Sequence, residues 1–561
     1  MQFKRFLAII PVSLLLFPSI AVAQEKLVDF DYWASLCDTL LQAEDYEKAL
    51  EACDQAVGLF PNDPEAWKNR GDVLFALARY GDALVSYEQV LRRSPTDSLA
   101  LAKRCASLTA LGRTDDAVVA CEEGLEIDGD WGEGTPAIAW YNRGVAMTQV
   151  GDHSQALESY DWAIRTNPGY SPAYAGRCST LAEFSRFEEA LKACDRAIQA
   201  DNWSDINPTT ALVNRGRILV QLAPTQDTSQ EALTFYQEAL KTYDEALAAD
   251  PDNEEAWTEQ GTVLGLLGRN TESLASQDWA LTLDENYALA LANRCAALNR
   301  LGQYTDAQAA CDKALQEGDD RWNRIGSAYA WSQRGNSLAG QFKYEEGLTS
   351  VNRALTLNPT YEQAWINQST LLWLLERYDE ALVSTQEAID LNPESSRAWY
   401  NRGRILTTLR EYEDAIVAYR MALEGDAQIG GQPSLEKIAI NLSAVLWRAG
   451  RYEEGVRAAV EAIGLNPDSA LGWYNRALNL MSNRQYTKAL EAYQKTLELN
   501  PNDANAWMGL GVTHRALKEY PESLAALTKA LELNPDNTQA QENFDDVTKI
   551  LEDLQNEASG G

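Results

Sequence analysis

The feature that most constrains this 561-residue chain is a sequence motif that returns every 34 residues. Prolines at this spacing mark the ends of successive copies; they are Pro61 and Pro95, Pro359 and Pro393, and Pro467, Pro501 and Pro535. Within a copy, position 4 is usually large, position 8 is small, positions 20 and 27 are mostly Ala, and position 24 is often aromatic or Cys. A pattern repeated at a fixed period predicts an array of similar supersecondary units.

Fourteen copies cover residues 30–537, and they start at Phe30, Pro64, Ser98, Ala137, Ser171, Thr209, Glu254, Ala288, Ala328, Glu362, Ser396, Glu436, Ala470 and Ala504. In period and pattern the motif resembles the tetratricopeptide repeat, a helix–turn–helix unit. The resemblance implies an all-α, right-handed α-solenoid whose stacked units share a continuous core. We expect a polar cap helix over residues 538–555 and a flexible tail over 556–561.

The sixth copy contains eleven extra residues around 224–238. A lengthened second helix that begins near Ser229 would keep Ala239, Tyr243 and Ala246 in register with the other copies. Such a helix would protrude on one side by about three turns. It is either a local docking feature or a tolerated insertion.

The N-terminus has the pattern of a cleavable secretory signal. Two basic residues precede an apolar run from Phe6 to Ile20, and Ala21-Val22-Ala23 forms a cleavage site. We therefore expect a signal peptide over 1–23, a short leader over 24–29, and export to the periplasm or the exterior. An uncleaved anchor is the alternative, but the run is short for a bilayer span and Pro11 and Pro18 interrupt it. No membrane span is expected in the mature chain.

Composition excludes several functional classes. The 83 acidic residues outnumber the 48 basic ones, for a net charge of −35. This charge disfavours binding to a nucleic-acid backbone and to an anionic membrane surface. With only two His residues, no nucleophile elbow and no P-loop, the sequence predicts no enzyme, no cofactor and no metal site.

All eight cysteines occupy position 8 or position 24 of a copy, and partners are sixteen residues apart. In the fold that the resemblance implies, these two positions face each other across the helix pair. Together with export to an oxidising compartment, this predicts four disulfides: Cys37–Cys53, Cys105–Cys121, Cys178–Cys194 and Cys295–Cys311. Buried free thiols are the alternative. Zinc binding is less consistent, because no site offers four nearby nitrogen or sulfur ligands.

Position 6 is Asn in eight copies: Asn69, Asn142, Asn214, Asn293, Asn367, Asn401, Asn441 and Asn475. Asn is unfavourable within a helix, so its recurrence implies a compensating contact. The column resembles the asparagine ladder of O-linked N-acetylglucosamine transferases, although their catalytic domain is absent. The resemblance implies that these amides hold the backbone of an extended polypeptide. Alternatively, they form hydrogen bonds with neighbouring helices.

Position 7 is Arg in nine copies: Arg70, Arg104, Arg143, Arg177, Arg215, Arg294, Arg334, Arg402 and Arg476. We expect ion pairs with acidic residues of the second helices in preference to ligand contacts.

Positions 2, 5, 9 and 12 of the first helices line the concave groove in the implied fold. They carry nearly balanced charge: Asp31, Asp38, Glu65, Asp72 and Glu255 against Lys68, Arg217, Arg397, Arg404, Lys437 and Arg515. From the tenth to the thirteenth copy they also carry Ile366, Trp373, Tyr400, Ile440, Trp447, Tyr474 and Met481, which we expect to be exposed in the groove. Aromatic and Arg side chains are typical of binding hot spots. The predicted peptide-binding residues are therefore the eight asparagines with Trp373, Tyr400, Arg404, Trp447 and Tyr474.

The sequence thus predicts a non-catalytic scaffold of the bacterial cell envelope that binds an extended peptide or a partner protein in its concave groove. The alternative is a structural assembly factor of envelope or secretion machinery that acts through an acidic convex face. The pattern specifies neither the partner nor the oligomeric state.

Overall fold

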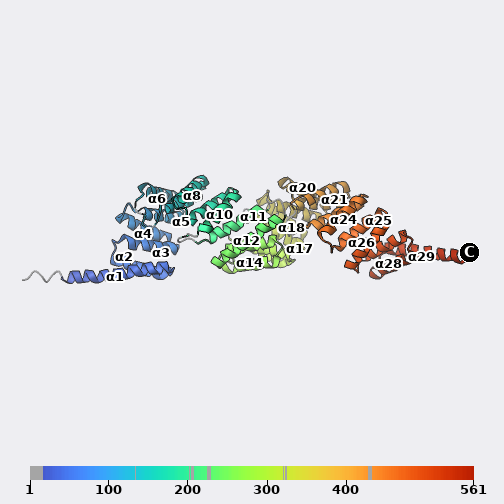
Figure 1. The fold of residues 1–561 in the computed structure, drawn as a ribbon, viewed down its shortest axis with the longest axis horizontal. Helices are drawn as coiled ribbons and strands as arrows, with labels where there is room; N and C mark the ends of the chain where they lie inside the picture. Colours follow the sequence, from blue (N-terminus) through green and yellow to red (C-terminus); the bar gives the residue numbers. More distant parts are fainter. Residues whose placement is uncertain are drawn as a thin grey trace, which may run out of the picture. The chain divides into compact units, whose positions relative to one another are not determined.

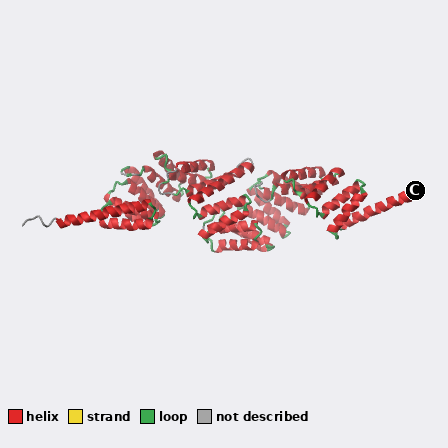
Figure 2. Cartoon of the chain, turned by 60° about the horizontal axis from the view of Figure 1, so that its bottom comes forward, coloured by secondary structure: helices red, strands yellow, loops and turns green. Residues whose placement is uncertain are grey.

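The computed structural model describes residues 17–129, 131–132, 134–200, 203, 207–223, 229–319, 321–322, 325–426 and 433–560. These residues form 29 α-helices and no strand (Figure 2). Most of the predicted signal peptide, residues 1–16, lies outside the described residues, as do residues 224–228 of the insertion. No helix in the described part of the chain combines the length and the apolar character needed to cross a membrane.

The helices follow one another as fourteen antiparallel pairs and a final helix (Figure 1). The first helices of the pairs are α1 (Phe17–Gln42), α3 (Pro64–Ala76), α5 (Ser98–Ala110), α7 (Pro136–Val150), α9 (Ser171–Glu183), α11 (Thr209–Leu222), α13 (Glu254–Leu266), α15 (Ala288–Arg300), α17 (Ala328–Gly340), α19 (Glu362–Leu374), α21 (Ser396–Leu409), α23 (Leu435–Arg448), α25 (Ala470–Ser482) and α27 (Ala504–Ala516). The second helices are α2 (Tyr46–Leu59), α4 (Tyr80–Arg93), α6 (Thr114–Ile127), α8 (His153–Thr166), α10 (Phe187–Ala200), α12 (Ser229–Ala249), α14 (Asn270–Leu283), α16 (Tyr304–Gln316), α18 (Tyr344–Leu357), α20 (Tyr378–Leu391), α22 (Tyr412–Glu424), α24 (Tyr452–Leu465), α26 (Tyr486–Leu499) and α28 (Tyr520–Leu533).

The helix boundaries agree closely with the repeat pattern. Thirteen of the fourteen first helices begin within one residue of the predicted start. The exception is α1, which begins at Phe17, so residues 24–29 continue the helix. The final helix, α29 (Thr538–Gly560), begins where the cap helix is expected and extends into the segment predicted as a tail.

The chain divides into two compact lobes. Lobe 1 comprises Met1–Leu222 and Lys241–Pro251, and lobe 2 comprises Ala223–Leu240 and Asp252–Gly561. The long helix α12 begins at Ser229, as predicted from the insertion, and contributes residues to both lobes. The three residues expected to stay in register, Ala239, Tyr243 and Ala246, are fully buried.

Local capping explains where many first helices begin. The side chains of Asp63, Asp97 and Asn253 each accept a hydrogen bond from the backbone N–H three residues later, at 2.8 Å. These side chains satisfy donors that have no partner within the helix. In the thirteen pairs other than α11 and α12, the turn between the two helices contains a residue with positive φ; where that residue is glycine, as at Gly112 and Gly268, the steric cost of a Cβ atom is avoided.

Small and large side chains meet between the two helices of a pair. A Cβ atom on Gly71 would lie 2.5 Å from the ring of Tyr87, and one on Gly144 would lie equally close to the ring of Tyr160. Glycine within a helix costs about 1 kcal/mol relative to Ala, but here it admits a buried aromatic ring. Positions 8 and 24 therefore form one packing unit in each repeat.

The cysteines occupy the same two positions in four other repeats. Their sulfur atoms lie 2.0 to 2.2 Å apart, and the corresponding Cα atoms 5.1 to 5.4 Å apart. These Cα separations are in the range that a disulfide requires. Each of the four predicted pairs is thus brought together within one helix pair, and no cysteine lacks its partner.

Candidate binding groove

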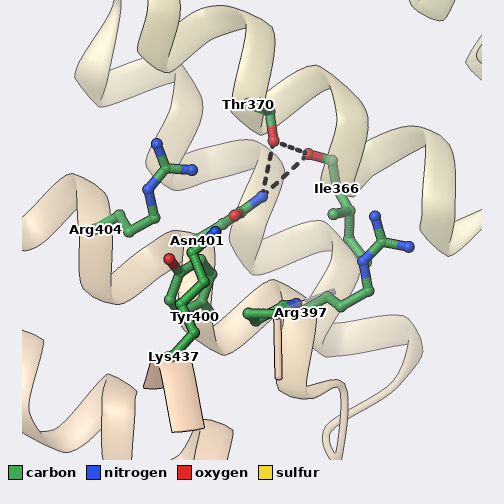
Figure 3. A pocket seen from close by; sticks show the side chains of 8 residues that line it. Ile366, Thr370, Arg397, Tyr400, Asn401, Arg404 and Lys437 are labelled. Atoms are coloured by element: carbon green, nitrogen blue, oxygen red, sulfur yellow. Dashed lines mark hydrogen bonds between the residues drawn. The ribbon is translucent and has the colours of Figure 1, made fainter. Parts of the chain in front are cut away.

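A pocket of about 160 Å³ lies between three consecutive first helices of lobe 2 (Figure 3). It is lined by Ile366 and Thr370 of α19, by Arg397, Tyr400, Asn401 and Arg404 of α21, by Lys437 of α23, and by Pro433 just before α23. On α21, Tyr400, Asn401 and Arg404 follow Arg397 by three, four and seven residues, a spacing that places all four on one face of the helix. The pocket contains three predicted site residues: Tyr400, Asn401 and Arg404.

Asn401 is held by the preceding first helix. Its Nδ2 atom donates to the carbonyl oxygen of Ile366 at 3.3 Å and to the hydroxyls of Ser369 and Thr370, each at 3.0 Å. Figure 3 shows two of these bonds on the side of Asn401 that faces α19. The amide donor is therefore engaged within the protein.

Most of the asparagine column makes the same kind of contact. Six of the eight Nδ2 atoms donate to the first helix of the preceding repeat: Asn142 to Ala102 O, Asn293 to Thr262 Oγ1, Asn367 to Ser332 Oγ, Asn401 to the three acceptors above, Asn441 to Tyr400 Oη, and Asn475 to Ile440 O. The alternative expectation, hydrogen bonding to neighbouring helices, is thus confirmed for these six. Binding of a polypeptide backbone by the column stays a prediction.

Two tryptophans of the groove are oriented by the next first helix along the chain. Trp373 of α19 donates from Nε1 to Thr408 Oγ1 of α21 at 3.1 Å, and Trp447 of α23 donates to Ser482 Oγ of α25 at 2.8 Å. The Arg404 guanidinium also lies over the Trp373 ring, 4.0 Å from its centroid. Both indoles are half-buried and are held in place before any ligand binds.

The expectation that every apolar groove position is exposed was wrong. Ile366, Tyr400 and Ile440, all at position 5, are 3%, 6% and 7% exposed. The reason is that this position packs against the second helices: Ile366 lies in a buried cluster with residues of α20, Tyr400 with residues of α22, and Ile440 with a residue of α24. Trp373, Trp447, Tyr474 and Met481 do retain partial exposure.

The hydroxyl of Tyr400 nevertheless lines the pocket edge, where it accepts a hydrogen bond from Asn441 at 2.9 Å. Burial raises the pKa of Tyr400, so this hydroxyl remains protonated at neutral pH and able to donate. Tyr474 occupies the corresponding position two repeats later, and burial raises its pKa as well.

The predicted ion pairs of position 7 are confirmed for seven of the nine arginines. In each pair, a guanidinium nitrogen lies 2.6 to 3.5 Å from a carboxylate oxygen of a second helix. The pairs are Arg70–Asp54, Arg104–Glu123, Arg143–Glu122, Arg177–Asp161, Arg215–Asp195, Arg294–Asp278 and Arg334–Asp312. Several of these arginines also donate to a hydroxyl of their own second helix, such as Arg334 to Ser350 at 2.7 Å. This column therefore connects neighbouring helices.

Charged residues of the predicted groove differ in their pairing. Lys68 pairs with Glu65, Asp72 pairs with Lys103, and Arg515 pairs with Asp546. In contrast, no described carboxylate lies within 4.0 Å of Arg397, Arg404 or Lys437, although Arg397 donates to the neutral side chain of Gln363. The sequence pattern placed these three cations in the groove but did not reveal that they share a pocket with Thr370.

Within the described ranges, no three His, Cys, Asp or Glu side chains come together in a way that could hold a metal ion. The side chains that line the pocket offer hydrogen bonding, cation–anion attraction and aromatic contact. These are properties of a binding surface.

Comparison with known proteins adds a family relationship. A model described as tetratricopeptide repeat matches residues 36–98, 141–204, 228–288, 384–429 and 474–538, which together exceed half of the chain. A second model with the same description matches residues 362–395.

Two solved structures resemble this one at low sequence identity. The alignment with the crystal structure of the APC/C hetero-tetramer Cut9–Hcn1 has 16% sequence identity and a TM-score of 0.47, and it covers 92% of this chain and 96% of that chain. The alignment with the crystal structure of YrrB, a TPR protein with an unusual peptide-binding site, has 21% sequence identity and a TM-score of 0.30, and it covers 34% of this chain and 96% of that chain.

Proposed function

Because the chain belongs to the tetratricopeptide repeat family, we propose that it is a non-catalytic interaction scaffold that binds an extended polypeptide segment along α19, α21, α23 and α25. The observation that carries this proposal is the set of oriented side chains on these helices. Trp373 and Trp447 are fixed by hydrogen bonds and keep exposed area, and the Arg404 guanidinium lies over the Trp373 ring. Preorganised aromatic and cationic side chains reduce the entropy lost on binding.

A role at the cell envelope is part of the same proposal. It is supported by the signal-like N-terminal sequence and by the four cysteine pairs at bonding distance, since disulfides persist in oxidising compartments. Export is tested by N-terminal sequencing of the protein from a bacterial envelope fraction. A mature chain that starts at Gln24 is the expected result, and an intact Met1 in the cytoplasm would contradict it.

The binding proposal is tested with peptides selected from a displayed random library on the full chain. Trp447→Ala should weaken the selected peptides about ten-fold or more, because hot-spot aromatics contribute 2 kcal/mol or more. The control is Trp279→Ala, which removes an exposed indole from α14, outside the groove. Equal binding to both variants, combined with strong dependence on salt, would contradict a groove site and favour the acidic outer surface.

A further inference from the structure

We infer that the pocket formed by Arg397, Arg404 and Lys437 binds the acidic side chains of a polypeptide, so that the preferred partner segment carries several Asp or Glu residues. This inference rests on the proposed function and names the chemical class of its ligand. The carboxylates would be side-chain groups within the segment.

The first support is an imbalance of charge. The chain carries 83 acidic residues and 48 basic ones, yet these three cations line one pocket with no described carboxylate within 4.0 Å of any of them. Other cations at groove positions of the first helices do have acidic partners; Arg515, for example, pairs with Asp546. Neighbouring like charges repel, so an anionic ligand would be stabilised by all three.

The second support is that the charged groups are held but not neutralised. Arg397 donates to Gln363, and Arg404 lies over Trp373, so the partners of both guanidinium groups are neutral. The Arg397 side chain is exposed to solvent, so a carboxylate of a ligand can reach its guanidinium group. A carboxylate can form two parallel hydrogen bonds with a guanidinium group, which makes this pairing stronger than one with a neutral donor.

The third support is the spacing of the cations, which favours several carboxylates over one small anion. Arg397 and Arg404 are seven residues apart on α21, or roughly 10 Å along the helix axis. Figure 3 shows their guanidinium groups on opposite sides of Asn401. This separation suits an extended chain, which advances about 3.3 Å per residue and can place successive acidic side chains near each cation.

The experiment measures binding of tetraglutamate, acetylated at its N-terminus and amidated at its C-terminus, to the full chain by calorimetry. The blocked ends leave side-chain carboxylates as the only anions, and tetraglutamine with the same ends is the neutral control. We expect tetraglutamate to bind despite the net charge of −35, and added salt to weaken it. Tetraglutamine should not bind measurably.

Three variants locate the site. Arg404→Gln and Lys437→Gln should each weaken tetraglutamate binding about ten-fold, as expected for loss of one charged hydrogen bond. Arg404→Lys, which keeps the charge, should lose less. The matched control is Arg353→Gln, an equal change of charge on the exposed side of α18, which should have no effect. Thermal melting shows whether each variant remains folded.

Several results would overturn the inference. These are equal affinity for tetraglutamate and tetraglutamine, equal loss of affinity in Arg404→Gln and Arg353→Gln, or tighter binding of inorganic phosphate than of tetraglutamate at the pocket. Library-selected peptides that need Trp447 but carry no acidic residue and ignore Arg404→Gln would leave the proposed function standing and overturn this inference. If tetraglutamate binding needs Arg404 but the library peptides bind Trp447→Ala as tightly as the wild type, this inference would stand and the proposed function would be overturned.

Discussion

The Arg404 guanidinium of α21 lies over the indole of Trp373 on α19, with its Cζ atom 4.0 Å from the ring centroid. The same indole donates a hydrogen bond to Thr408, one turn further along α21. Two contacts from one helix therefore orient an aromatic side chain of its neighbour. Residues that could bind a partner are thus also part of the packing between repeats.

This double role predicts a small but measurable effect of Arg404→Ala on stability. Loss of a partly exposed cation–π contact should lower the free energy of unfolding by about 0.5 to 1 kcal/mol, measured in urea. Arg353→Ala, on an exposed face of α18, should change it less. A larger loss than this would mean that Arg404 has a mainly structural role.

Asn401→Ala should destabilise lobe 2 by about 1 to 3 kcal/mol. The substitution removes a buried donor and leaves the carbonyl of Ile366 without that bond. Asn505→Ala on α27 is the control, because that side chain is exposed. Chemical denaturation of both variants checks the prediction. If Asn401→Ala and Asn505→Ala were equally stable, the asparagine column would not contribute to packing, and a purely ligand-binding role would be favoured.

Gly403→Leu should destabilise the protein by about 1 to 3 kcal/mol through overpacking. A Cβ atom at this position would already lie 2.8 Å from the ring of Tyr419. Gly464→Ala on α24 is the matched control, because its Cβ would meet no atom within 4 Å. Better helix propensity should make the control neutral or slightly stabilising. Differential scanning calorimetry of both variants measures the contrast, and tolerance of leucine at position 403 would refute it.

Reduction of the cysteine pairs should affect the two lobes unequally. Lobe 1 contains three of the four pairs, whereas lobe 2 contains only Cys295 and Cys311. Each bridge closes a short loop and contributes about 3 kcal/mol in the chain-entropy model. Calorimetry with and without reductant should therefore show a drop of several degrees mainly in the transition of lobe 1.

Mass mapping under non-reducing conditions provides the control for that experiment. It should recover only pairs that are sixteen residues apart. Other pairings, or free thiols in the exported protein, would contradict the compartment argument as well as the stability prediction.

Arg321→Gln should change how stability depends on pH. Arg321 pairs with Asp319, Asp284 and Glu254. Burial alone would raise the pKa of Asp319, but hydrogen bonds from the Ala288 N–H and from Arg321 outweigh it and lower that pKa below 3.8. The resulting stabilisation is present above pH 3.8 and is lost as the pH falls through the lowered value.

In Arg321→Gln the pKa of Asp319 should move back toward 3.8. The stability difference between wild type and variant should therefore be constant near neutral pH and shrink below about pH 4. Urea denaturation at a series of pH values measures it. A difference that grows on acidification would mean that Asp319 is not the group responsible.

Much of the fold could be predicted because its contacts depend on short distances along the chain. Residues at positions 8 and 24, such as Gly403 and Tyr419, are sixteen apart and meet within one helix pair. Arg334 and Asp312 are also close in sequence, and their ion pair was expected from the pattern. A repeated motif specifies such contacts because the two residues lie either in the same copy or in two adjacent copies.

The candidate site was decided by how consecutive first helices pack, which no single copy of the motif encodes. Close approach of α19 and α21 buries Ile366 and engages the Asn401 donor, whereas packing against α22 and α23 buries Tyr400. Residues expected to face a ligand therefore join neighbouring helices instead. The same approach places Arg397 and Arg404 in one pocket without an acidic partner. Sequence alone determined the helix pairs, because their contacts lie within a few turns. Tertiary structure decided which polar groups remain available, because a side chain's exposure depends on the helix packed against it.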